Sequence, residues 1–181
     1  TDFEYDLPPE LIAQEPVTPR DHSKLMVLSG GTSEHVSFFD LPKYLKPSDT
    51  LVLNNTRVFP ARLRGQKITG GKIELLLLER QSTTRWLTLV RGAFRAGTLK
   101  FKNNIQGELL ECNERGEWTI EFSEDIRPQL DDSGEMPLPP YIKRPTPRAA
   151  DLDRYQTVVA KEEGAVAAPT AGFHFTEGLL D

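Results

Sequence analysis

The stretch "RLRGQKITGGKIELLLLERQSTTRWLTLVRG" (residues 62–92) consists of three short apolar-rich runs separated by the turn sequences "TGG" and "QSTT". Three further runs follow, "GTLKFKN" (97–103), "IQGELLECN" (105–113) and "EWTIEFS" (117–123), with no helical run between them. Short runs repeating every roughly 8–12 residues, with turn signals between them, are typical of antiparallel all-β architectures. This part of the chain therefore predicts a small barrel or sandwich of about six strands.

The residues on either side of this segment have a mixed character. "SKLMVLS" (23–29) and "HVSFF" (35–39) flank a glycine turn and predict a hairpin. "LPPELIAQ" (7–14) predicts a short helix, and the apolar run "DTLVLNN" (49–55) predicts a buried strand. The predicted fold class is mixed, α+β. An α/β-like catalytic domain (1–61 and 136–181) carries an inserted antiparallel β-barrel of about six strands (62–135).

Composition excludes several classes of protein. Hydrophobic residues make up 38% and charged residues 27% of the chain, which is typical of a globular protein and not of a disordered one. No apolar run reaches the length of a membrane span, and the N-terminal sequence "TDFEYDLPPE" does not resemble a secretory signal. The single Cys112 excludes an internal disulfide and a cysteine-based zinc site. We expect a cytoplasmic protein without a membrane partner.

Charge is unevenly distributed along the sequence. Residues 57–107 hold eleven Lys and Arg against only Glu74 and Glu79, a net charge of +9 in a chain whose total is −5. Such a segment can attract a phosphate backbone, or its charges can simply spread over solvated strand faces. Within the predicted barrel, the candidate aromatic platforms for stacking on bases beside these cations are Trp86, Phe94 and Phe101.

Common cofactor motifs are absent from the sequence. It contains no G-x-G-x-x-G motif and no G-x-x-x-x-G-K-[ST] loop, which excludes an ordinary Rossmann dinucleotide or methyltransferase loop and a P-loop. The three histidines, His22, His35 and His174, lack metal-ligand spacing, so we expect no metal site.

Polar side chains follow the predicted strand in "LVLNNTRVFPAR" (51–62). Asn54, Asn55, Thr56 and Arg57 would place two amides, a hydroxyl and a guanidinium at one sheet edge. Arg57 offers a planar fork for a carboxylate or phosphate. An Asn-rich turn capping the next element is the alternative interpretation.

Three further stretches combine rigid or small residues with reactive groups. "MPLPPYIKR" (136–144) sets a proline-fixed backbone beside an aromatic ring, and "DRYQTVVA" (153–160) presents three polar residues in a row. In "AAPTAGFHF" (167–175) small residues allow a ligand to approach closely, and His174 titrates near neutral pH. A packed structural histidine is the alternative for His174.

Together these stretches resemble the signature blocks of the S-adenosylmethionine:tRNA ribosyltransferase-isomerases of queuosine biosynthesis. The blocks are "YDLPPELIAQEPVTPRDHSKLMVL" (5–28), "DTLVLNNTRVFPARLRGQKITGGKIELLLL" (49–78), "GEMPLPPYIKR" (134–144) and "DRYQTVVAKEEGAVAAPTAGFHFTEGLL" (153–180). Members of that family look like an α/β domain with an inserted β-barrel. They continue beyond "AGFHFT", so we expect these 181 residues to be part of a longer protein.

The resemblance implies transfer of the ribosyl part of S-adenosylmethionine onto 7-aminomethyl-7-deazaguanine (preQ1). The acceptor is at the wobble position of a tRNA anticodon. The product is epoxyqueuosine, and adenine and methionine are released. S-adenosylmethionine is then a co-substrate, no metal is needed, and we expect a monomer. The alternative is a non-catalytic RNA-binding β-barrel module with structural flanks.

The resemblance also implies a set of site residues. The catalytic candidates are His174 as acid/base, Arg57 and Thr170. Candidates for binding the substrate are Asn54, Asn55, Thr56, Arg62, Tyr141, Arg144, Tyr155, Gln156, Thr157 and Pro169. Candidates for contacting tRNA are Arg80, Arg85, Arg91, Arg95, Lys100 and Lys102. Tyr141 and Tyr155 would stack on or hydrogen-bond to a base, and Gln156 or Thr170 would orient the ribose.

Overall fold

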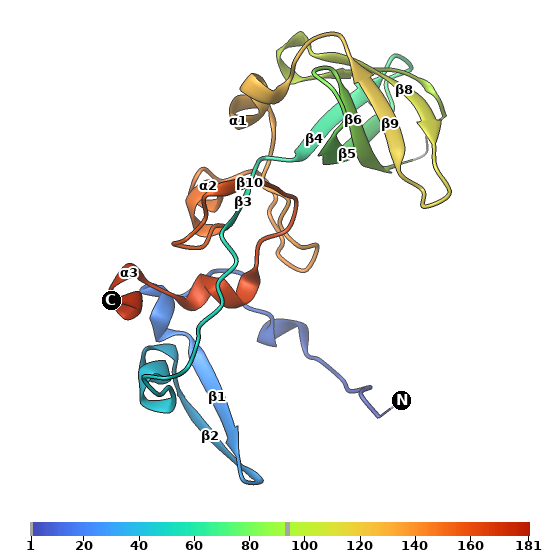
Figure 1. Ribbon diagram of the computed structural model, residues 1–181. Coiled ribbons are helices and arrows are strands. Elements are labelled where there is room, and N and C mark those ends of the chain that lie inside the picture. Colours follow the sequence, from blue (N-terminus) through green and yellow to red (C-terminus); the bar gives the residue numbers. More distant parts are fainter. Residues whose placement is uncertain (1, 93–94) are drawn as a thin grey trace.

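The computed structural model describes residues 2–92 and 95–181 and has an elongated shape (Figure 1). A β-barrel forms one end and the β1–β2 hairpin forms the other, with the short β3–β10 pair and helix α2 between them. The fold is mixed, as predicted, and consists of one barrel, two small sheets and a few short helices.

The six predicted strands form a closed antiparallel barrel in the order β4-β5-β6-β9-β8-β7. Its strands are β4 (Arg62–Lys67), β5 (Lys72–Arg80), β6 (Arg85–Arg91), β7 (Gly97–Phe101), β8 (Gln106–Cys112) and β9 (Trp118–Phe122). Closure leaves no unpaired strand edge, so each strand is hydrogen-bonded to a neighbouring strand on both sides. The prediction of an antiparallel barrel of about six strands is confirmed.

The barrel interior is filled by alternate residues of these strands. Leu75 and Leu77 of β5 are fully buried, whereas the intervening Leu76 is only partly buried, as the period of two in a strand requires. Gly65 faces inward, where a Cβ would lie 2.6 Å from the Phe101 ring, so the strand needs glycine there. The 3-10 helices η4 (Lys102–Asn104) and η5 (Arg127–Gln129) and helix α1 (Leu130–Ser133) adjoin the barrel.

The N-terminal part contains the predicted hairpin. Strands β1 (Lys24–Ser29) and β2 (Thr32–Ser37) pair antiparallel through Gly30 and Gly31, whose φ angles of 56° and 81° suit a tight hairpin turn. The predicted helix at 7–14 is reduced to the 3-10 turn η1 (Pro9–Leu11). The 3-10 helices η2 (Arg20–His22) and η3 (Phe38–Tyr44) flank the hairpin.

The middle of the molecule is built from both chain ends. Strand β3 (Thr56–Val58) pairs parallel with β10 (Glu162–Ala165), beside helix α2 (Ala150–Arg154). A second small core forms where Val58, Met136 and Tyr155 pack together. The 3-10 helix η6 (Thr170–His174) and helix α3 (Glu177–Leu180) follow β10.

The predicted buried strand at 49–55 is wrong. Residues 49–55 form no strand, and Val52 is 87% exposed. The pairing begins only where β10 supplies a partner, since the amides of Lys161 and Glu162 donate to the Asn55 carbonyl. An apolar run alone does not make a strand without a neighbouring ladder to receive its backbone groups.

The division of the chain into domains at residues 62 and 135 stays a prediction. Arg62 begins β4 and forms an isolated antiparallel bridge with Glu135, so the two predicted boundaries lie side by side. Within residues 2–92 and 95–181, no helix has both the length and the apolar character needed to cross a membrane.

Candidate active site

Four predicted site residues line one small cavity, which we call the tyrosine cavity. Tyr141, Arg144, Tyr155 and Thr170 surround a volume of about 240 Å³ together with Phe173. Tyr155 is buried and its ring lies 5.4 Å from that of Phe173, while Tyr141 is half exposed. Burial raises the pKa of the Tyr155 phenol, which keeps it protonated and able to donate a hydrogen bond. The structure thus brings together residues from three separate sequence blocks.

Gln14 fixes the proline-rich wall of the tyrosine cavity. Its Nε2 donates to the Tyr141 carbonyl at 3.0 Å, and its Oε1 accepts from the Lys143 amide at 2.8 Å. Its own carbonyl accepts from Arg144 Nη1 at 2.9 Å. Sequence reasoning missed this residue. The available signal was an amide, able to donate and accept at once, directly after the apolar run 11–13 and shortly before Pro16.

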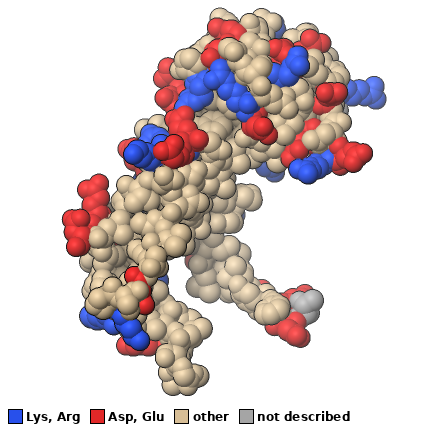
Figure 2. Space-filling model, viewed as in Figure 1, with Lys and Arg blue, Asp and Glu red and all other residues tan. Residues whose placement is uncertain are grey.

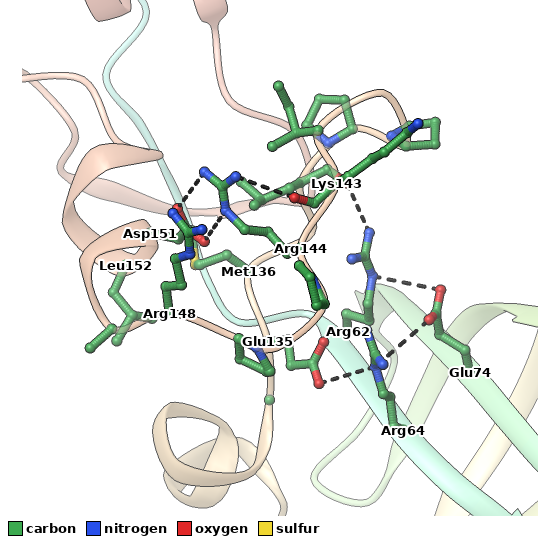
Figure 3. A pocket seen from close by; sticks show the side chains of 18 of the residues that line it. Arg62, Arg64, Glu74, Glu135, Met136, Lys143, Arg144, Arg148, Asp151 and Leu152 are labelled. Atoms are coloured by element: carbon green, nitrogen blue, oxygen red, sulfur yellow. Dashed lines mark hydrogen bonds and ion pairs between the residues drawn. The ribbon is translucent and has the colours of Figure 1, made fainter. Parts of the chain in front are cut away.

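Arg144 and Asp151 form an ion pair at the boundary of this cavity. Arg144 Nε donates to Asp151 Oδ2 at 3.0 Å, and the two side chains are only 11% and 12% exposed. Figure 3 shows the guanidinium directed at this carboxylate and away from the barrel. The N–H groups of the Arg144 guanidinium are therefore largely occupied by protein partners, and the pair fixes the position of the segments that carry it.

A larger cavity of about 630 Å³, the barrel cavity, lies between strands β4–β5 and the proline-rich segment. On its barrel side Arg62 and Arg64 alternate with Glu74 and Glu135 (Figure 3). Arg64 Nε lies 3.1 Å from Glu135 Oε1, and Arg62 Nε lies 3.6 Å from Glu74 Oε1. The predicted substrate residue Arg62 also donates to the Leu138 carbonyl at 2.9 Å, so it joins the barrel to the wall of the tyrosine cavity.

Helix η6 separates the tyrosine cavity from a third one. Thr170 lines the tyrosine cavity, whereas Ala171 and Gly172 line a hollow of about 290 Å³ together with Asn54 and Pro169. We call this hollow the asparagine cavity. The small residues of this segment thus form a thin wall with a cavity on each side. Their small side chains would let a ligand in either cavity come close to the backbone.

His174, the predicted acid/base, is not among the residues that line the tyrosine cavity or the asparagine cavity. Its Nδ1 lies 2.7 Å from Ser23 Oγ, and its ring lies 5.1 Å from that of Phe38. Burial lowers its pKa below the ordinary value of 6.5, because a desolvated imidazolium is disfavoured. His174 is therefore neutral at pH 7 and can accept a proton. Ser23 was not predicted as a neighbour, since it lies in a distant block of the sequence.

The predicted polar group at 54–57 is partly engaged in local structure. Asn54 Oδ1 accepts from the Thr56 amide at 2.8 Å, as in an Asx turn, and Thr56 Oγ1 approaches the Glu162 carbonyl at 3.5 Å. Arg57 is exposed, and its guanidinium has no hydrogen bond or ion pair within the described part of the chain. Arg57 thus remains available for a ligand anion.

Gln156 and Thr157 are buried beneath the site. Gln156 Nε2 donates to the Val58 carbonyl at 2.6 Å, and its Oε1 accepts from the Val58 amide at 3.0 Å. Both ends of this amide therefore bind β3. The buried Thr157 hydroxyl has no hydrogen-bond partner among residues 2–92 and 95–181.

The six predicted tRNA contacts fall into different groups. Arg80 and Arg85 pair with Asp125 and Glu121 at 2.8 Å and 2.6 Å. Arg91, Lys100 and Lys102 line one groove on the barrel, and Arg95 lines another hollow.

Two of the three predicted stacking aromatics are not available on the surface. Trp86 and Phe101 are buried in the barrel core, and Phe94 lies outside the described residues. Among the described residues, no group of three or more His, Cys, Asp or Glu side chains is placed to hold a metal ion, and the expected absence of a metal stays a prediction.

Comparison with known sequences assigns the family. Residues 1–181 match the profile of the family described as queuosine biosynthesis protein. The chain belongs to this family. The family assignment agrees with the resemblance found in the sequence blocks, three of which line the tyrosine cavity.

Two curated relatives illustrate the similarity to the queuosine biosynthesis family. Proteins named S-adenosylmethionine:tRNA ribosyltransferase-isomerase from Moorella thermoacetica and Clostridioides difficile are 50% and 51% identical over 99% of the chain. The matches cover 54% of each relative, so the chain spans about half the length of the curated relatives it matches. A crystal structure of S-adenosylmethionine tRNA ribosyltransferase from Thermotoga maritima is 33% identical over 99% of this chain and 52% of that one, with a TM-score of 0.38.

Proposed function

We propose that the chain acts as an S-adenosylmethionine:tRNA ribosyltransferase-isomerase in queuosine biosynthesis. It would move the ribosyl moiety of S-adenosylmethionine onto preQ1 in tRNA, giving epoxyqueuosine and releasing adenine and methionine. The observation that carries the proposal is about 50% identity along 99% of the chain to relatives with this name. The co-substrate, the preQ1 acceptor at the wobble position and a monomeric state are parts of the same proposal.

The tyrosine cavity is the proposed site for a planar base. Its rings and its proline-rich wall offer apolar faces, and the Tyr155 hydroxyl and Thr170 hydroxyl offer hydrogen bonds at its edge. Aromatic stacking combined with a few placed polar groups is the usual way to bind a nucleobase or nucleoside. Thr170 would then orient the ribose, and Gln156 and Thr157 would hold β3 and η6 in place behind it.

Arg57 is proposed to bind the carboxylate of the methionine part. Its guanidinium is exposed and unpaired in the described chain, and the residue follows closely after Asn54 and Asn55 in the sequence. Arg–carboxylate pairs are commonly bidentate, which would fix the orientation of the sulfonium end. Asn54, Pro169 and the asparagine cavity would contact the same end of the co-substrate.

His174 is proposed as the acid/base. The reaction needs a base to remove an acidic proton from the carbon next to the sulfonium, and a neutral imidazole is the form that can do so. The lowered pKa of His174 favours that form at neutral pH. The Ser23 hydroxyl, 2.7 Å from Nδ1, would hold the ring and leave Nε2 for the substrate.

Adenine release tests this function and separates it from the binding-module alternative. The chain is incubated with S-adenosylmethionine and tRNA carrying preQ1, and free adenine is measured by chromatography. Release that requires both substrates supports the enzyme. If the Moorella thermoacetica relative releases adenine under the same conditions while this chain binds tRNA and releases none, the alternative of a non-catalytic RNA-binding module is correct.

A further inference from the structure

One outer face of the barrel carries several cations at neighbouring register positions. Arg64 of β4 lies opposite Glu74 of β5, which lies opposite Arg91 of β6. Gln66 of β4 lies opposite both Lys72 of β5 and Lys100 of β7. Directly opposed residues in a sheet point to the same side, so these residues form two rows on one face of β7-β4-β5-β6.

The same residues line a groove of about 610 Å³, which we call the basic groove. It shares Arg64, Glu74 and Arg91 with the barrel cavity, so the two hollows adjoin. The barrel cavity in turn shares the wall that includes Leu138 and Arg144 with the tyrosine cavity. A polymer lying in the basic groove would therefore lead toward the proposed site.

The charge balance in the basic groove is strongly positive. Glu74 is its only carboxylate among the described residues, against the five cations Arg64, Lys72, Arg91, Lys100 and Lys102. The side chains of Lys72, Arg91 and Lys100 are exposed and have no ion-pair partner within the described part of the chain. Lys102 Nζ binds only a backbone oxygen, that of Asp132 at 2.8 Å.

The opposite ends of β5 and β6 carry cations that already have carboxylate partners. Arg85 of β6 is paired with Glu121 of β9, which also lies opposite Glu108 of β8. Arg80 is paired with Asp125. Figure 2 shows that charged side chains of both signs gather on the barrel, whereas the middle of the visible face is mostly uncharged. Exposed cations that already have a carboxylate partner gain little from a second anion.

We propose that the outer face of β4, β5, β6 and β7 binds the phosphate backbone of the substrate tRNA along the basic groove, and that Arg80 and Arg85 lie outside this contact. The inference rests on the proposed function. The unpaired cations supply the attraction through counterion release, and the one aromatic ring among the described residues of the groove, that of Phe101, is buried in the barrel. The groove therefore contacts phosphates and not bases, and it positions the tRNA without reading its sequence.

The test compares two double variants with equal loss of charge. Lys72→Gln/Lys100→Gln removes two groove cations, and Arg80→Gln/Arg85→Gln removes two paired ones. Affinity for the substrate tRNA is measured at several salt concentrations by filter binding. Each lost phosphate contact should lower the slope of log affinity against log salt by roughly 0.7–0.9, so the groove variant should lose roughly 1.4–1.8 and the control far less.

Several outcomes would overturn the inference. An unchanged slope in the groove variant, an equal loss in both variants, or no tRNA binding by the wild-type chain would each do so. The single variants Lys72→Gln and Lys100→Gln, both of exposed residues, decide the question if the double variant does not fold. If adenine release fails while the groove variant still shows its reduced slope, the proposed function is wrong and the groove assignment stands.

Discussion

Arg144 and Asp151 are paired at 3.0 Å with side chains only 11% and 12% exposed, and both residues line the tyrosine cavity and the barrel cavity. The same guanidinium binds the Gln14 carbonyl, so one ion pair connects the N-terminal segment, the proline-rich wall and helix α2. The sequence marked Arg144 as a substrate ligand. The structure favours a positioning role for Arg144 between two cavities.

We expect Asp151→Ala to lower the free energy of unfolding by about 3 kcal/mol, because it leaves a poorly solvated guanidinium without its partner. Urea unfolding of the variant measures this directly. Asp153→Ala, which removes an exposed carboxylate from the same helix, is the control and should change stability by less than about 0.5 kcal/mol. Equal losses in the two variants would contradict a structural role for the pair.

Gly134 is expected to tolerate no side chain. A Cβ at this position would lie 2.1 Å from the Pro60 carbonyl oxygen and 2.7 Å from that of Leu130, and backbone atoms cannot rotate away. Gly134→Ala should therefore cost about 2 kcal/mol or more by overpacking. Gly178, whose Cβ would meet nothing within 4 Å, is the matched control. Denaturant midpoints of the two alanine variants that coincide would show that this junction is looser than described.

Burial of His174 makes stability depend on pH in a defined direction. Because its folded-state pKa lies below 6.5, the unfolded chain takes up a proton at a pH where the folded chain stays neutral. The contribution of His174 to stability is complete above pH 6.5 and decreases as the pH falls toward the folded-state pKa.

We expect His174→Gln to reduce the loss of unfolding free energy between about pH 7.5 and 5.5. Chemical unfolding at the two pH values measures this change. His35→Gln, at an exposed position on β2, should retain the loss seen in the wild-type chain. The account of the buried imidazole is wrong if His174→Gln and the wild-type chain lose the same amount.

Arg57→Gln should affect binding more than chemistry. If the guanidinium holds the methionine carboxylate equally in the ground and transition states, KM for S-adenosylmethionine rises with little change in kcat. His174→Gln should instead lower kcat by roughly 10²–10⁴-fold, as loss of a general base does. Steady-state adenine release gives both parameters, and near-native values in both variants would remove these two roles.

The barrel was predictable from the sequence because its pattern is local. Each strand within residues 62–123 is marked in the sequence by an apolar run followed by a turn. Strands that pair, such as β4 and β5, are often consecutive in the chain. The run at 51–53 could not be interpreted in this way, since a strand at that position depends on a ladder partner far away in sequence.

The site was only partly predictable. Residue type identified Tyr141 and Tyr155, which do line one cavity. The partners of these residues were not evident. Gln14 and the proline-rich wall, and Ser23 and His174, are separated by long stretches of chain. Asp151 lies only seven residues after Arg144, but residue type alone does not show that the chain turns back to pair them. Which arginines are neutralised also depends on register, as the pairing of Arg85 with Glu121 shows.

The proposed reaction delivers the ribosyl carbons of S-adenosylmethionine, and not its methyl group, to the tRNA. The most direct measurement supplies the chain and preQ1-containing tRNA with co-substrate labelled either in the ribose or in the methyl group. The tRNA is then recovered and counted. The account predicts label in the tRNA from the ribose only, in step with released adenine. Label from the methyl group, or no label from the ribose while the Moorella thermoacetica relative transfers it, would contradict the account.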